Sequence, residues 1–206
     1  GGGGERARQV WGHAESVAVE QRGFLSSIMV PNIVVKAVAR SKDRDAVKKA
    51  EGILLRLESA YLAGKSLLRP DVTTYSSVIN ACAYYKGDAE GRADALDTAL
   101  RTFYKLCDME DESPNNITYG TLFKAVANLM SVGRQREELV RQLFDQCAEE
   151  GLVDSFVLSQ VRIASPELYR DLVDEPGSSG LDVVLRIRRP PRSTPSQTPC
   201  PYAPRS

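Results

Sequence analysis

The sequence predicts an all-α protein in which helical hairpins stack in series as a solenoid, and two observations lead to this fold class. An apolar segment recurs three times with a constant step of 44 residues, at residues 34–39 (VVKAVA), 78–83 (VINACA) and 122–127 (LFKAVA). Apolar residues across the region 24–173 also follow the spacing of amphipathic helices. Recurrence at a period of about 20–50 residues is typical of repeat proteins, whose units bury their apolar faces against neighbouring units. Function is therefore expected along a surface.

The first helix of each unit is predicted from one apolar stripe. In the second unit this stripe comprises Tyr75, Val78, Ile79, Cys82 and Ala83, and the third unit repeats it at positions 119, 122, 123, 126 and 127. The tyrosines at positions 75 and 119 lie on the stripe, so they are predicted to be packing residues rather than platforms for stacking a base.

A second helix follows in each unit, and its apolar anchors step by four and then three residues. The anchors are Ala50, Leu54 and Leu57, then Ala99, Phe103 and Leu106, then Val140, Phe144 and Cys147. Short polar or glycine-containing breaks at 41–43, 86–88 and 132–133 separate the two helices of each unit. Pro70 and Pro114 mark the junctions between units, since proline lacks the N–H donor that a continuing helix needs. Each unit is thus predicted to be a helical hairpin.

The predicted domain organisation has three parts. Residues 24–173 form the helical repeat region, with units starting near 28, 72, 116 and 155, and Ser165-Pro166 begins a short final helix. Residues 1–23 are interpreted as an N-terminal segment that contains the second helix of a truncated repeat, because the chain begins with four glycines and no methionine. Residues 174–206 hold 7 of the 11 prolines and are predicted to be a disordered Pro/Arg/Ser-rich tail.

Composition excludes several classes of function. The chain has 27 basic and 27 acidic residues, and no run approaches the ~18 apolar residues that a membrane helix needs. The four cysteines form no CxxC pair, which argues against zinc and against a disulfide framework. His13 is the single histidine, no glycine-rich phosphate loop occurs, and the acidic run 108–112 is interpreted as a solvated linker. The sequence therefore predicts no enzyme activity, no metal, no cofactor, no small-molecule substrate and no membrane association.

Two stretches resemble the opening of a pentatricopeptide repeat. Residues 69–81 and 114–122 both contain Pro-Asp or Pro-Asn, an apolar residue, Thr-Tyr, a small residue and then an apolar helix. The resemblance covers roughly residues 28–154 and is to the family as found in plants and algae, where the module also forms the RNA-binding arm of protein-only RNase P. The units here are longer than the family's own, and the first has Val30-Pro31 in place of the Thr-Tyr pair.

The resemblance implies a right-handed superhelical solenoid of antiparallel hairpins that binds single-stranded RNA, one base per unit, in a mitochondrion or chloroplast. The implied base-reading pairs are Asn32 with Asp71, Ser76 with Asn115, and Gly120 with Asp154. By the family's code the first pair favours uracil and the second adenine, whereas the third reads weakly because glycine has no side chain. The residues implied to sandwich the bases are Met29, Thr73 and Ile117.

Several of these residues also have a structural interpretation. Asp71 and Asn115 stand where helix N-caps stand, and a cap alone would explain them. Lys36, Arg40 and Lys124 are candidate phosphate contacts, and Lys36, Asn80 and Lys124 recur at one position of successive first helices. A solvated helix face explains them equally well. Two alternative functions remain open: a helical-repeat scaffold that binds a protein partner, favoured by the zero net charge, and the RNA-gripping arm of a larger nuclease.

Overall fold

The computed structural model describes residues 28–41 and 43–173, and every regular element within those ranges is a helix. The all-α fold class is therefore confirmed for this part of the chain. The predicted N-terminal segment 1–23 and tail 174–206 lie outside the described residues. The elements are α2 (Met29–Arg40), α3 (Ala46–Leu62), the short 3-10 helix η1 (Ser66–Leu68), α4 (Val72–Ala83), α5 (Ala89–Cys107), α6 (Asn116–Leu129), α7 (Arg134–Glu149), α8 (Ser155–Ala164) and α9 (Pro166–Val173).

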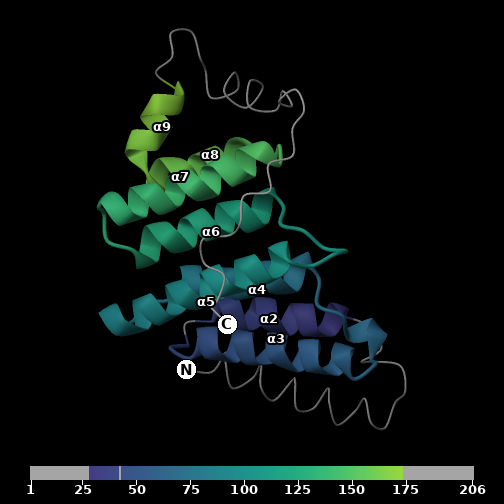
Figure 1. Cartoon of the computed structure of the whole chain (residues 1–206). Coiled ribbons are helices and arrows are strands. Elements are labelled where there is room, and N and C mark those ends of the chain that lie inside the picture. The colour runs from purple at the N-terminus through teal and green to yellow at the C-terminus, as the bar shows by residue number, and fades with distance from the viewer. Residues whose placement is uncertain (1–27, 42, 174–206) are drawn as a thin grey trace, which may run out of the picture.

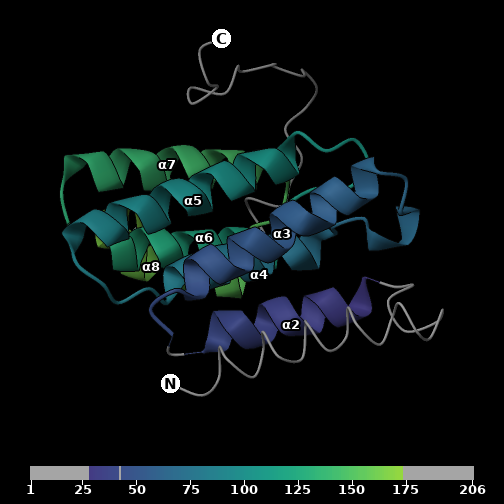
Figure 2. The same cartoon turned by 90° about the horizontal axis from the view of Figure 1, so that it is seen from below.

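The helices form two layers, which Figures 1 and 2 show from two directions. Helices α2, α4, α6 and α8 pack on one another in this order, and α3, α5 and α7 lie on one side of that row. Each of these three helices contacts the helix before it and the helix after it in the sequence. We call α2, α4, α6 and α8 the first helices. They begin at residues 29, 72, 116 and 155, next to the predicted unit starts. No helix within the described ranges is long and apolar enough to cross a membrane.

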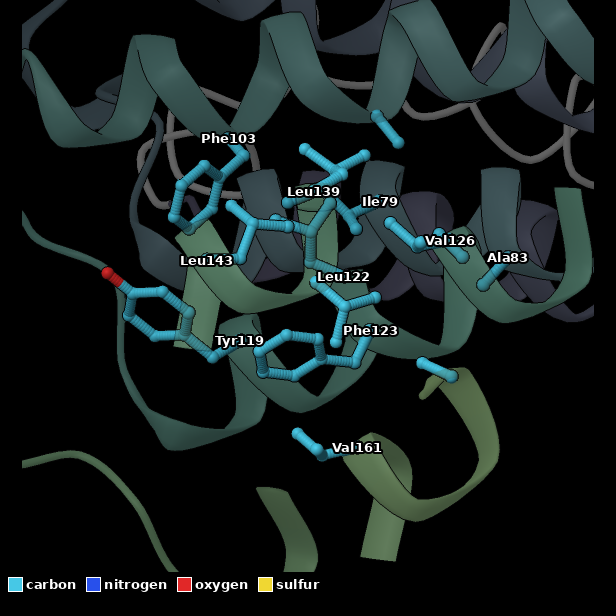
Figure 3. Packing of buried hydrophobic residues seen from close by; sticks show 14 of the residues in the cluster. Ile79, Ala83, Phe103, Tyr119, Leu122, Phe123, Val126, Leu139, Leu143 and Val161 are labelled. Carbon is cyan, nitrogen blue, oxygen red and sulfur yellow. The ribbon is translucent and has the colours of Figure 1, made fainter. Parts of the chain in front are cut away.

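Two apolar clusters hold the layers together. One lies mainly among α2, α3 and α4, and the larger one lies mainly among the helices from α4 to α9. Figure 3 shows part of the larger cluster. In the larger cluster the rings of Phe103 and Tyr119 meet edge to face, with centroids 5.1 Å apart. Tyr75 and Tyr119 are both buried, so the prediction that they are packing residues is confirmed. The nine predicted anchors of the second helices are buried as well.

Three of the four first helices begin with the same kind of N-cap. The side chain of Asp71 accepts a hydrogen bond from the Thr74 N–H at 2.9 Å, and that of Asn115 accepts one from the Thr118 N–H at the same distance. Asp154 caps α8 in the same way. The threonine hydroxyls at 74 and 118 in turn accept a hydrogen bond from the backbone N–H of the capping residue, which completes a capping box. The recurring Pro-Asp/Asn and Thr-Tyr landmarks are thus a helix start, and the N-cap interpretation is confirmed.

A buried arginine ties the third hairpin to the fourth. Arg136 in α7 is 6% exposed, and its guanidinium donates to the carbonyls of Ala164 at 2.6 Å and Ile163 at 2.8 Å. Longer contacts of 3.4 Å reach the carbonyls of Ala127 and Met130. These carbonyls lie at or next to the C-terminal ends of α6 and α8, where the helix dipole favours a cation. One side chain therefore satisfies the ends of two first helices.

Candidate functional site

A pocket of about 290 Å³ opens between three successive first helices, α2, α4 and α6. We call it the first-helix pocket. Its walls carry short hydroxyl and amide side chains together with two cations. It is lined by Lys36, Ala39, Arg40, Val72, Thr73, Ser76, Ser77, Asn80, Asn115, Ile117 and Thr121. The residues singled out from the sequence that it brings together are Lys36, Arg40, Thr73, Ser76, Asn80, Asn115 and Ile117. Met29, Asn32, Asp71, Gly120, Lys124 and Asp154 do not line it.

Asn32 and Asp71 face each other instead of the pocket. The Asn32 amide nitrogen donates to both carboxylate oxygens of Asp71, at 3.0 and 3.1 Å, and the Thr74 hydroxyl donates to the amide oxygen at 2.6 Å. Asn32 is 8% exposed. Its polar atoms are therefore engaged within the protein, where they join α2 to the first turn of α4.

Ser76 and Asn115 meet at a third residue. The Ser76 hydroxyl lies 2.8 Å from the hydroxyl of Thr118, whose N–H is capped by Asn115. Both Ser76 and Asn115 are half-buried and border the first-helix pocket. This pair thus keeps access to the pocket while its geometry is set by the capping box of α6.

The third pair, Gly120 and Asp154, is engaged by neighbouring residues of the chain. A Cβ atom at residue 120 would lie 2.2 Å from a ring carbon of Phe156, so the ring fills the space beside the glycine. The Asp154 carboxylate accepts from the Val157 N–H at 2.8 Å and from the Asn116 amide at 2.6 Å. Both of these hydrogen bonds engage the Asp154 carboxylate within the protein.

The residues implied to sandwich bases differ in exposure. Met29 is 66% exposed and Ile117 is 57% exposed, whereas Thr73 is half-buried. Thr73 and Ile117 occupy the second position of α4 and α6 and both line the pocket. An exposed isoleucine at the rim of a polar pocket gives an apolar surface that a planar group can contact.

The candidate phosphate contacts fall into two kinds. Lys36 and Arg40 are exposed on α2 and form no ion pair with any residue that the structure describes. Lys124 lies over the ring of Tyr84, with its Nζ 4.0 Å from the ring centroid and 2.5 Å from the hydroxyl oxygen. The hydrogen bond from Lys124, its charge and that of Arg40 lower the pKa of Tyr84. Two cations are thus available at the pocket, and the third is engaged with an aromatic ring.

Asn80 lines the pocket but belongs to none of the implied base-reading pairs. It follows Ser76 by four residues, so both lie on one face of α4, and this spacing is visible in the sequence. The Asn80 side chain is half-buried and makes no hydrogen bond with residues 28–41 or 43–173. Its amide carries donors and an acceptor that a ligand could use. Ser77 and Thr121 also line the pocket, but their hydroxyls donate to carbonyls of their own helices.

Reactive groups are scarce in the part of the chain that the structure describes. That part holds no group of three or more His, Cys, Asp or Glu side chains that could bind a metal ion. Burial raises the pKa of the Cys82 and Cys147 thiols to about 12, so both are protonated near neutral pH and are poor nucleophiles. His13 lies outside the described residues. The first-helix pocket therefore provides hydrogen-bonding groups and positive charge.

Comparisons with protein-family models, curated proteins and solved structures found no match for this chain.

Proposed function

We propose that this protein binds single-stranded RNA along its row of first helices, as a right-handed solenoid of the pentatricopeptide kind. The observation that carries the proposal is the first-helix pocket, in which Ser76, Asn80 and Asn115 converge from α4 and α6 beside Lys36 and Arg40 of α2. Three successive hairpins contribute to one polar surface. A strand that crosses the row would meet all three.

The chemistry of the pocket suits an unstacked base. Sequence-specific RNA recognition uses hydrogen bonds to base edges that are splayed out of a helix, together with apolar or aromatic side chains against the base face. The Asn80 amide and the Ser76 hydroxyl supply short polar groups, and Ile117 supplies the apolar rim. Lys36 and Arg40 can neutralise the adjoining phosphates, which is the main source of affinity for nucleic acids.

Not every implied base-reading pair has the same role in this proposal. Ser76 and Asn115 border the pocket and read the base, with Asn80 as a further contact. Asn32 and Asp71 hold α2 against the start of α4, and Gly120 admits the ring of Phe156. Base selectivity is therefore concentrated between the first and third hairpins. By the family resemblance, the bound RNA belongs to organelle RNA processing, stability or translation, in a mitochondrion or chloroplast.

Binding of labelled single strands tests the proposal directly. Fluorescence anisotropy at low salt should show binding to A-rich and U-rich single strands and weaker binding to duplex RNA. Ser76→Ala and Asn80→Ala should each weaken the binding of single strands by about three- to tenfold, as expected for one lost hydrogen bond. Ser59→Ala is the matched control, because its exposed hydroxyl bonds only the Leu55 carbonyl of α3 among the residues that the structure describes. Absent binding, or equal losses in all three variants, would contradict the proposal.

A second candidate is a scaffold that binds a protein, and exposed leucines favour it. Leu55 and Leu62 are seven residues apart on α3, hence on the same side of the helix, and Leu67 follows in η1. All three are exposed, Leu62 most of all. Exposed apolar clusters mark interaction sites. A scaffold would lose its partner in Leu55→Ser/Leu62→Ser and keep it in Asn80→Ala, as measured by affinity capture with each variant.

A further inference from the structure

A second and larger pocket, of about 980 Å³, lies where the first two hairpins turn. We call it the turn pocket. It is formed by the end of α2, the turn into α3, the end of α4 and the turn into α5. Ala39, Arg40 and Asn80 line both this pocket and the first-helix pocket. The two pockets therefore adjoin at Arg40 and Asn80.

The turn pocket carries three cations that pair with no carboxylate in the described part of the chain. Arg40, Arg44 and Lys86 are exposed and form no ion pair within residues 28–41 and 43–173. The pocket also contains two carboxylates, Asp43 and Asp88.

Both carboxylates have local partners. Asp43 forms an ion pair with Lys49 and accepts from the Asp45 N–H at 3.0 Å. Asp88 accepts from the Gly91 N–H at 2.8 Å as the N-cap of α5. Asp43 is neutralised by Lys49, and the remaining carboxylate, Asp88, is outnumbered by the three cations, so the pocket is positive overall.

Two adjacent tyrosines form an aromatic wall of the pocket. Tyr84 is 49% exposed, and Lys124 lies over one of its faces. Tyr85 is half-buried, and its hydroxyl lies 2.0 Å from where a Cβ at Gly87 would be and 1.9 Å from one at Gly91. Only residues without a side chain leave room for this placement. The pocket therefore has a fixed aromatic side next to a group of cations.

We propose that the turn pocket is a second RNA contact, which binds phosphates of the strand beside the bases held in the first-helix pocket. Arg40, Arg44 and Lys86 neutralise the phosphates, and Tyr84 gives a stacking surface for an adjoining base. These contacts are independent of sequence. The strand would leave the row of first helices near Asn80 and continue toward the hairpin turns. This inference rests on the RNA binding proposed above.

The experiment uses Arg44→Gln/Lys86→Gln, which spares Arg40 because Arg40 lines both pockets. The double variant should bind A-rich and U-rich single strands more weakly by the same factor. Each phosphate contact contributes about 0.7 to the slope of log K against log salt for single strands. The variant lacks two such contacts, so a fourfold rise in salt should reduce its RNA affinity by a factor about seven times smaller than for the wild type. Tyr84→Ala should lower affinity without changing the slope.

The matched control is Lys48→Gln/Arg56→Gln, which removes the same charge from exposed positions of α3 outside every pocket described above. Circular dichroism checks that each variant is folded. If the wild type binds RNA and the two double variants have equal slopes, the turn pocket is not a phosphate site, although the RNA proposal stands. If the wild type binds no RNA at low salt, both proposals are wrong. A loss that depends on base identity would also overturn the turn pocket, since phosphates carry no sequence information.

Discussion

The ring of Phe156 in α8 occupies the space beside Gly120 in α6 that any side chain at residue 120 would enter. The nearest ring carbon is 2.2 Å from the position of a Cβ atom there. Glycine at this position thus lets the fourth hairpin pack closely on the third. Packing alone accounts for the residue that, by the family resemblance, belongs to a base-reading pair.

The contact between Gly120 and Phe156 makes their substitutions non-additive. Alanine is a better helix former than glycine by about 1 kcal/mol, so Gly120→Ala should stabilise a chain that also carries Phe156→Ala. With the ring present, the same substitution has to displace it and should lower the free energy of unfolding. We expect a coupling energy of about 1–2 kcal/mol from urea unfolding of the double-mutant cycle. Additive effects would show that the ring moves aside without cost.

The helices could be predicted from the sequence because their signals are local. The stripe through Tyr75 and Ile79 and the capping box of Asp71 and Thr74 each depend on residues within one helix or at its start. The break between paired helices is equally local. Such patterns fix where a helix begins and which face it buries.

The details of the site depend on which residue of a neighbouring unit lies opposite. The apolar period does not predict that the Asn32 amide bonds Asp71 or that Phe156 covers Gly120. Those contacts follow from the offset between hairpins, which is set by linkers that carry no periodic signal. Asn80 is an intermediate case, because its helix face was predictable but its lack of a hydrogen-bond partner among the described residues was not.

Arg136 should be among the most costly polar residues to replace. Arg136→Met keeps much of the side-chain volume but leaves the carbonyls of Ala164 and Ile163 without their donor. Hydrogen bonds from a charged group contribute about 1.5–3 kcal/mol each, so we expect a loss of about 3 kcal/mol in the free energy of unfolding. Chemical denaturation measures this loss.

Arg134→Met is the control for Arg136. Arg134 is exposed, and its one ion-pair partner within residues 28–41 and 43–173 is Glu138, four residues along the same helix. Such pairs contribute about 0.3–0.5 kcal/mol, so its removal should be nearly neutral. Similar losses of stability in the two variants would mean that water replaces Arg136 as the hydrogen-bond donor to the carbonyls at the ends of α6 and α8 without a cost in free energy.

Alkaline pH should destabilise the fold through its buried thiols. Burial raises the pKa of Cys82 and Cys147 to about 12, above the value of about 8.5 of an unfolded cysteine. The unfolded chain therefore releases these protons first, and the stabilisation present below pH ~8.5 declines as pH rises toward 12, by about 1.4 kcal/mol per pH unit for each thiol. Cys82→Ala/Cys147→Ala should flatten the dependence of stability on pH in this window. A slope that is unchanged in the double variant would contradict the assignment.

Substitutions of Asn32 and Asp71 distinguish most clearly between a structural role and a base-reading role for Asn32. If the Asn32 amide serves to hold Asp71, then Asn32→Ala and Asp71→Ala should be coupled by about 1–3 kcal/mol in the free energy of unfolding, since the hydrogen bond is to a carboxylate. Asp88→Ala removes a comparable N-cap, whose carboxylate bonds no side-chain amide in residues 28–41 and 43–173, and should show no coupling with Asn32→Ala. At a temperature where the variant is folded, Asn32→Ala should then change affinity for U-rich strands by less than about twofold. A selective loss of U-rich binding would instead assign Asn32 to the base, and the amide would have to leave Asp71 when RNA binds.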